Sequence, residues 1–194
     1  LPLIPKRGSN SLMEWIKIFT PLTKDLIETL RCGDLCLISG KLLTARDKAH
    51  ERIKQMSADG EKLPFELKDE LIYYVGPTPA KPGEIIGAAG PTTSSRMDPF
   101  SSMMFDLGIK GMIGKGKRDK QTKELIQKYH AVYFSSFGGA GAYLSKRIKS
   151  SKIIAFNDLA SEAVHELVVE DFPVVVAIDM YGDDIYEHAV QRRG

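Results

Sequence analysis

The fold of this chain is decided by one stretch, Gly76-Pro77-Thr78-Pro79-Ala80-Lys81-Pro82-Gly83, which joins two short apolar segments. Its prolines lack the backbone N–H that a helix needs, and the flanking glycines favour turns. A simple doubly wound sheet would connect the two segments through a helix, because parallel neighbours need a long crossover. We therefore expect a mixed sheet with an antiparallel part, in which this stretch is a rigid connection without a helix.

Strand-like and helix-like segments alternate on both sides of this stretch, which is typical of the α/β class. Short apolar runs predict strands over residues 15–19, 35–38, 71–75, 84–88, 110–113, 132–135, 152–156, 166–169 and 174–178. Amphipathic patterns predict a helix capped by Thr20, a helix capped by Thr44, and helices over 99–107, 120–130, 142–148 and 159–164. A loop over 40–43 and a turn over 170–173 complete the expected mixed sheet flanked by helices.

Length and charge limit the domain organisation and the partners. The chain has 194 residues, and we assign a single domain to residues 13–194. Residues 1–12 precede Met13 and are irregular, so we expect them to be a leader that is processed or was artificially added. The net charge of +2 argues against a nucleic-acid partner, which would need a strongly basic face. We also expect no membrane partner, because no apolar run reaches the roughly 18 residues of a transmembrane helix.

The only two cysteines, Cys32 and Cys36, are separated by three residues. They are too few for a disulfide framework, which favours a reducing, cytoplasmic location. Zinc and iron–sulfur sites need three or four ligands, and no histidine follows within the next dozen residues. We therefore predict that both thiols are structural and that this chain holds no metal.

The segment GPTTSSRMD at residues 90–98 indicates an anion site. Four consecutive hydroxyl residues leave a Gly-Pro turn and lead into Arg96 near the predicted start of a helix. Hydroxyl groups and free backbone N–H groups at a helix start donate to anions, and arginine binds a carboxylate or phosphate through two parallel hydrogen bonds. A small carboxylate or phosphate is therefore the expected ligand.

Two glycine-rich segments leave alternatives open. Residues 111–117 match the phosphate-binding pattern G-x-x-x-x-G-K, but Arg118 replaces the Ser or Thr that would bind magnesium. A surface turn of solvated lysines explains this segment equally well, although Lys115 could still contact an anion. Residues 138–141 precede a predicted helix, and Asp158 follows at a distance that suits a dinucleotide fold. The glycine spacing fails there, so close packing is an equal explanation.

Arg46 lies in the segment TARD at residues 44–47, at the predicted start of a helix. A cation is unfavourable at this end of the helix dipole. Arg46 either pairs with Asp47 or faces an anion bound at the turn. Because Arg96 repeats the arrangement, the two arginines together with Lys115 would suit a ligand with two carboxylates.

Four segments in this order resemble one known family: TARDKAH at 44–50, GPTTSSRMD at 90–98, GKGKR at 114–118 and VEDFP at 169–173. Together they are similar to the β subunit, or C-terminal domain, of the class I iron–sulfur hydro-lyases, which include fumarate hydratase and L-tartrate dehydratase. The resemblance extends over about residues 19–186. It implies a swivelling β/β/α domain and reversible addition of water to a C4 dicarboxylate, for example fumarate to L-malate.

The resemblance also implies a partner and roles for individual residues. The partner is an α subunit, in an α2β2 assembly, whose three cysteines hold a [4Fe–4S] cluster with one iron open to substrate. In this chain Arg46, Arg96 and Lys115 would bind substrate, Thr92 would transfer the proton, and Thr93 and Ser94 would be helpers. The alternatives are a tartrate dehydratase β subunit, a phosphate- or nucleotide-binding module, and a scaffold whose basic loops dock another protein.

Overall fold

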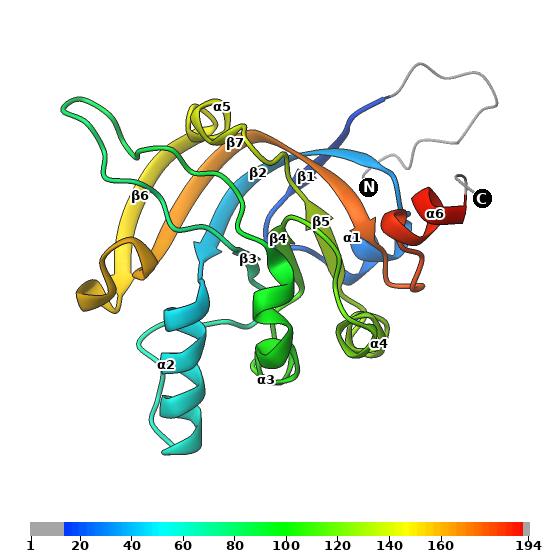
Figure 1. Ribbon diagram of the computed structural model, residues 1–194, viewed down its shortest axis with the longest axis horizontal. Coiled ribbons are helices and arrows are strands. Elements are labelled where there is room, and N and C mark those ends of the chain that lie inside the picture. Colours follow the sequence, from blue (N-terminus) through cyan, green and yellow to red (C-terminus); the bar gives the residue numbers. More distant parts are fainter. Residues whose placement is uncertain (1–13, 192–194) are drawn as a thin grey trace.

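A seven-stranded mixed sheet forms the centre of the computed structural model, which describes residues 14–191 (Figure 1). The strands follow the order β1-β2-β3-β4-β5-β7-β6 across the sheet. They are β1 (Ile16–Phe19), β2 (Leu35–Thr44), β3 (Leu71–Tyr73), β4 (Gly111–Gly114), β5 (Val132–Ser135), β6 (Ile148–Ala155) and β7 (Val164–Ile178). The helices are α1 (Lys24–Thr29), α2 (Asp47–Ala58), α3 (Ser101–Asp106), α4 (Lys120–Lys128), α5 (Gly141–Ser145) and α6 (Ile185–Gln191), with 3-10 helices η1 (Ser94–Phe100) and η2 (Asn157–Glu162).

The predicted combination of parallel and antiparallel pairing is confirmed. Strands β1 to β5 run parallel to one another, whereas β7 runs antiparallel to β2, β5 and β6. Because β7 pairs with both β5 and β2, the five strands β2, β3, β4, β5 and β7 form a closed circuit of pairing. The long β7 thus lies across the parallel strands and completes the sheet.

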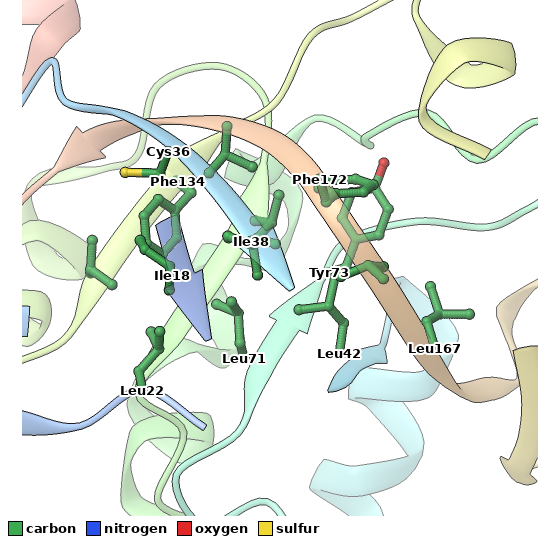
Figure 2. Packing of buried hydrophobic residues seen from close by; sticks show 14 of the residues in the cluster. Ile18, Leu22, Cys36, Ile38, Leu42, Leu71, Tyr73, Phe134, Leu167 and Phe172 are labelled. Atoms are coloured by element: carbon green, nitrogen blue, oxygen red, sulfur yellow. The ribbon is translucent and has the colours of Figure 1, made fainter. Parts of the chain in front are cut away.

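Two hydrophobic cores lie on opposite faces of the parallel strands. Leu71 and Tyr73 of β3 point into the first core, between the parallel strands and β7, where they meet Ile18, Phe134 and Phe172 (Figure 2). Ile72, which lies between them on β3, points into the second core, which α2, α3 and α4 cover (Figure 1). Successive side chains of a strand face opposite sides, so an unbroken apolar run is needed where both sides are buried. This explains why β3, β4 and β5 are apolar throughout.

The parallel strands also determine where the functional segments emerge. Strands β2, β3 and β4 are neighbours, and their last residues, Thr44, Tyr73 and Gly114, lie at the same edge of the sheet. The carboxyl edge of parallel strands is the usual place for ligand sites in α/β proteins. The segments that begin with Ala45, Tyr74 and Lys115 therefore start side by side.

Two strands are longer than the sequence predicts. The expected loop over 40–43 is wrong, because β2 continues to Thr44 and only shifts register at Gly40, whose φ is +117°. The expected turn over 170–173 is also wrong, because β7 is one strand of 15 residues. Phe172 in its middle is fully buried against Tyr73, with ring centroids 5.3 Å apart. Burial and pairing outweigh the local turn preference of the acidic residues there.

The expected strand over 84–88 is absent, and this segment bonds to the connection before it. The backbone N–H of Thr78 donates to the Ala88 carbonyl (3.1 Å), and the Ala88 N–H donates to the Thr78 hydroxyl (2.9 Å). A Cβ on Gly87 would collide with Thr78 and Pro79, which explains the glycine at this close approach. The proline-rich connection itself has no helix, as predicted.

Both predicted helix caps are wrong. The hydroxyl that caps α1 belongs to Thr23, which accepts from the Leu26 N–H at 3.3 Å, whereas Thr20 precedes a cis proline. Thr44 is the last residue of β2, and its hydroxyl accepts from the His165 N–H at 2.9 Å. Helix α2 begins after Arg46 instead.

The remaining predicted elements agree with the structure in place, with shifted ends. The expected helix over 142–148 stops at Ser145 because β6 already begins at Ile148, and the helix expected over 159–164 is the 3-10 helix η2. Between residues 14 and 191, no helix is long and apolar enough to cross a membrane. The leader predicted at 1–12 lies outside the described residues.

Candidate active site

The hydroxyl-rich segment and the Lys115 segment lie side by side, joined by backbone hydrogen bonds. The Thr92 N–H donates to the Tyr74 carbonyl at 2.7 Å, and the Lys115 N–H donates to the Thr92 carbonyl at 3.2 Å. The Ser94 N–H then donates to the Lys115 carbonyl at 2.9 Å, so that Thr93 and Lys115 form a bridge of parallel type. Thr92 and Lys115 are therefore held next to one another beyond the ends of β3 and β4.

The side chains of these two residues are available to a ligand. Both residues are partly exposed, and within residues 14–191 neither the Thr92 hydroxyl nor the Lys115 ammonium has a hydrogen-bond or ion-pair partner. The Lys115 stem lies over Gly138, where a Cβ would come within 3.6 Å of its Cδ. The Lys115 stem therefore lies beside the segment that follows β5.

Arg46 occupies the N-cap position of α2 and makes no capping hydrogen bond with its side chain. Glu162 of η2 caps the helix instead, because its Oε2 accepts from the Lys48 N–H at 2.8 Å. The Arg46 guanidinium lies between two carboxylates, with Nη2 3.7 Å from Glu162 Oε1 and Nε 3.5 Å from Asp47 Oδ2. These acids offset the unfavourable position of a cation at the start of a helix. Arg46 Nε itself is buried without a hydrogen-bond partner among the described residues.

Arg96 meets the same acid from the other side. Its Nε donates to Asp47 Oδ1 at 3.0 Å and its Nη2 donates to Asp47 Oδ2 at 2.6 Å, which is a bidentate pair. Arg96 lies inside the 3-10 helix η1, not at the start of an α-helix, and 49% of its side chain is exposed. The structure therefore brings the two predicted arginines together at one carboxylate, 49 residues away from Arg96 in the sequence.

The two predicted helper residues differ in environment. Thr93 is exposed, whereas Ser94 is fully buried and its hydroxyl donates to the Tyr133 oxygen at 2.9 Å, because the Tyr133 proton goes to the Gly116 carbonyl at 2.8 Å. Ser94 also lies directly over Gly114, where any Cβ would overlap its Oγ. Ser94 thus anchors the hydroxyl-rich segment onto β4 and β5.

A buried ion pair connects η1 to the segment after β4. The Arg118 side chain is fully buried, its Nε is 2.5 Å from Asp98 Oδ1, and its Nη2 donates to the Ser101 hydroxyl at 3.1 Å. The guanidinium carbon lies 5.5 Å and 5.0 Å from the ring centres of Tyr74 and Tyr133. Arginine suits such a site because its planar group stacks on aromatic rings while it pairs with an acid.

The structure does not favour a phosphate-binding loop at residues 111–117. Gly111–Gly114 is strand β4, so these residues form no loop around an anion. Helix α4 begins only at Lys120, and Asp119 caps it by accepting from the Thr122 N–H at 2.7 Å. The residue that breaks the motif, Arg118, is the buried partner of Asp98.

In the glycine cluster after β5, Gly141 is explained by close packing and Gly139 by its backbone φ of +78°. The backbone of Gly141 lies against Gly90, and a Cβ there would come within 3.0 Å of the Gly90 nitrogen. Asp158 pairs on the surface with Arg52 at 2.7 Å. Neither observation supports a dinucleotide site.

His50 supports Arg46 from inside the second core. Its Nδ1 is 2.7 Å from the Arg46 carbonyl oxygen, which can only accept, so Nδ1 carries the proton. The ring packs against Tyr74 and Phe100, and Nε2 is buried without a partner among the described residues. Burial lowers the pKa of His50 to about 4, a net value that also includes the raising effect of the Arg46 carbonyl and a smaller lowering from the charge of Arg118.

The cysteines do not fit an iron–sulfur cluster. Cys36 is fully buried in the first core with Ile18 and Phe134 (Figure 2), and both cysteines are free. Burial, together with the smaller effect of nearby aspartates, raises the pKa of both thiols to about 12, whereas cluster ligands are thiolates. Among residues 14–191, no group of three His, Cys, Asp or Glu side chains could hold a metal ion.

Three acids that pair with Arg46, Arg96 or Arg118 were not predicted as site residues. Asp47 and Asp98 each follow a basic residue closely in the sequence, within the very motifs that indicated the site, and this is a signal that could have found them. Glu162 has no such signal, because it reaches α2 from 114 residues away. Only the folded chain brings it to Arg46.

Comparison with known proteins places these motifs in a family. A family described as "Fumarase C-terminus" matches residues 3–189. A Methanocaldococcus jannaschii protein named as an L(+)-tartrate dehydratase subunit beta is 38% identical over 175 residues, which cover 87% of this chain and 90% of that protein. Fumarate hydratase 2 of Leishmania major is 35% identical over 96% of this chain, and the anaerobic class I fumarate hydratase of Escherichia coli is 34% identical over 80%. The chain spans only 34% and 29% of these two fumarate hydratases.

Removing one member of the buried ion pair should strongly destabilise the fold. Asp98→Asn leaves the Arg118 charge buried without a counter-charge, and we expect the free energy of unfolding to fall by about 3–5 kcal/mol in urea unfolding. The control Asp158→Asn removes an acid from the exposed pair with Arg52 and should change stability little. Equal effects of the two variants would contradict a structural role for the Asp98–Arg118 pair.

Acid should destabilise the chain through His50. The unfolded chain binds a proton near pH 6.5, whereas the folded chain resists protonation until about pH 4, so stability is lost as the pH falls through this window. Between pH 7 and pH 5 this contribution is about 2 kcal/mol. We expect His50→Gln to lose less stability over that range than the wild type, and the exposed His188→Gln to follow the wild type. A wild-type pH profile for His50→Gln would show that His50 is not the responsible group.

Proposed function

Because the chain belongs to the fumarase C-terminus family, we propose that it is the substrate-binding part of a hydro-lyase that adds water reversibly to a C4 dicarboxylate. Two observations support this proposal: Arg46 and Arg96 share the carboxylate of Asp47, and Lys115 lies beside Thr92, both at segments that follow the carboxyl ends of neighbouring parallel strands. Two arginines at one carboxylate and a lysine beside a hydroxyl suit a ligand with two carboxylates and a reacting carbon between them. Fumarate to L-malate is the reaction we favour.

In this proposal the three cations bind the substrate and Thr92 transfers the proton. Arg46 and Arg96 bind the substrate carboxylates, and Lys115 binds a carboxylate or hydroxyl oxygen beside Thr92. During dehydration the deprotonated Thr92 oxygen accepts the proton from the carbon next to one carboxylate, while the bond from the adjacent carbon to its hydroxyl breaks and the hydroxyl leaves with the electron pair of that bond. The iron of the proposed α chain would supply the Lewis acidity for the leaving hydroxyl, and during hydration Thr92 returns the proton as the hydroxyl adds back. An unassisted threonine hydroxyl is a poor base at neutral pH, so the adjacent Lys115 cation supports the proposal by stabilising the deprotonated oxygen. Thr93, exposed beside Thr92, and the anchoring Ser94 are proposed as helpers.

We propose that a separate α chain holds the [4Fe–4S] cluster. The naming of the Methanocaldococcus jannaschii relative as a β subunit implies an α partner for that protein. The protonated, separated thiols of this chain do not fit a cluster, which agrees with a division of labour between two chains. We propose an α2β2 assembly and, because both thiols are free, a reducing cytoplasmic location. The two stacked cores agree with the swivelling β/β/α arrangement that we propose for this domain.

L-tartrate is the second candidate substrate. It also carries two carboxylates at a similar spacing, and the relative named as a tartrate dehydratase subunit matches this chain over 90% of its own length. The same residues would serve the same reaction class. Assays with fumarate, malate and tartrate on one preparation decide between the substrates.

The proposal predicts activity only in the presence of a cluster-bearing partner. Purified chain should be inactive alone and should gain hydratase activity when combined with the reconstituted α chain. In that complex, Arg96→Lys should lower kcat/KM by about 100-fold, because lysine cannot bind a carboxylate through two parallel bonds. Thr92→Val should lower kcat by about 10²–10⁴-fold through loss of proton transfer.

The control for Arg96→Lys is Arg52→Lys, which changes an arginine that pairs with Asp158 on the surface. This variant should keep wild-type kinetics. Activity of the isolated chain after treatment with a chelator would contradict the division between two subunits. Wild-type kinetics of Arg96→Lys would remove Arg96 from the site.

A further inference from the structure

We propose that Asp47 is a positioning residue that orients the two arginines toward the substrate. This inference rests on the proposed function and adds to it a residue that would not itself touch substrate. Its carboxylate bonds to Arg96 through both oxygens and lies 3.5 Å from Arg46 Nε. One acid thus contacts both cations that would hold the dicarboxylate.

The Arg96–Asp47 pair leaves free the edge of the Arg96 guanidinium that is formed by Nη1 and Nη2. Asp47 takes the edge formed by Nε and Nη2, at 3.0 Å and 2.6 Å. A guanidinium carries five N–H donors in a rigid fork, so the hydrogens on Nη1 and the outer hydrogen on Nη2 remain for another acceptor. A carboxylate bound at that end would meet two parallel donors whose plane Asp47 has already set.

The charge of Asp47 allows the two arginines to stay close together. Two guanidinium groups at one site repel each other, and an acid between them removes much of that repulsion. Glu162 provides a second acid at Arg46, 3.7 Å from Nη2. The two acids balance the two arginines, while the Lys115 ammonium has no ion-pair partner among residues 14–191.

The backbone that carries Asp47 is itself held in place. Asp47 is the first residue of α2, where the helix dipole stabilises an acid. Glu162 accepts from the N–H of the next residue, Lys48, and His50 donates to the carbonyl of Arg46. Only 25% of the Asp47 side chain is exposed. A fixed acid of this kind can orient a half-exposed arginine, because the arginine then loses little freedom on binding substrate.

The opposite role would be a competing counter-ion that the substrate displaces from Arg96. The two roles give different kinetics when the charge is removed by Asp47→Asn. Loss of a competitor lowers KM and leaves kcat unchanged. Loss of a positioning residue lowers kcat, because the arginines no longer hold the substrate in the reactive geometry.

We therefore expect Asp47→Asn, in complex with the α chain, to lose at least tenfold in kcat with a smaller change in KM. Asp47→Glu keeps the charge but moves the carboxylate by one methylene, and it should show a partial loss of kcat. The control Asp158→Asn breaks the exposed pair with Arg52 and should keep wild-type kinetics. Unchanged kcat in Asp47→Asn, with or without a lower KM, would overturn the proposal. If Asp47→Asn does not fold, the kcat of Asp47→Glu decides in the same way.

A second measurement does not depend on activity. In nuclear magnetic resonance spectra of the isolated chain, the Arg96 Nε–H signal, assigned by its loss in Arg96→Lys, should exchange slowly with water. In Asp47→Asn it should exchange at least tenfold faster, and in Asp158→Asn it should not change. Equal exchange in wild type and Asp47→Asn would overturn the role of Asp47. An inactive wild-type complex would instead refute the proposed function, while this exchange rate still tests the contact.

Discussion

The buried ion pair between Asp98 and Arg118 is the interaction on which the rest of the site depends. It joins η1, which carries Arg96 two residues earlier, to the segment after β4, which carries Lys115 three residues earlier. The Arg118 guanidinium also lies near the rings of Tyr74 and Tyr133. Tyr74 directly follows β3 and Tyr133 lies in β5, and these are the two strands that pair with β4. Both charges are buried, so removing or displacing one of them would leave the other buried without a counter-charge. The buried Asp98–Arg118 pair therefore fixes the positions of Arg96 and Lys115 relative to each other.

Above this pair, the site uses the shared edge of parallel strands. The segments that follow β2, β3 and β4 start at neighbouring points and supply the groups of the site: Arg46 after β2, Thr92 and Arg96 after β3, and Lys115 after β4. The two arginines share Asp47, whereas Lys115 and Thr92 lie together without side-chain partners in the described part of the chain. The paired arginines suit binding of a ligand, and the Lys115 and Thr92 side chains suit the proposed proton transfer.

The sequence predicted those parts of the molecule that depend on local pattern. Buried parallel strands such as β4 and β5 are short apolar runs, and the motifs around Arg46, Arg96 and Lys115 stand out by residue type. Long-range pairing was not predictable. Strand β7 runs through a turn-like acidic segment because Phe172 packs on Tyr73 across the core, and β2 passes through Gly40 because it pairs on both sides. The contacts of Asp47 with Arg96 and of Glu162 with α2 join residues 49 and 114 positions apart, a distance over which local preference carries no information.

The central claim is that Arg46, Arg96, Lys115 and Thr92 form one dicarboxylate site. The most direct test is a crystal structure of the chain in complex with its α partner and a bound C4 dicarboxylate. The account predicts carboxylate oxygens about 3 Å from both guanidinium groups and from the Lys115 ammonium. It also predicts the Thr92 hydroxyl facing a central carbon and Asp47 still bonded to Arg96. A dicarboxylate bound away from the carboxyl edge of β2, β3 and β4, or bound there without contact to either arginine, would contradict it.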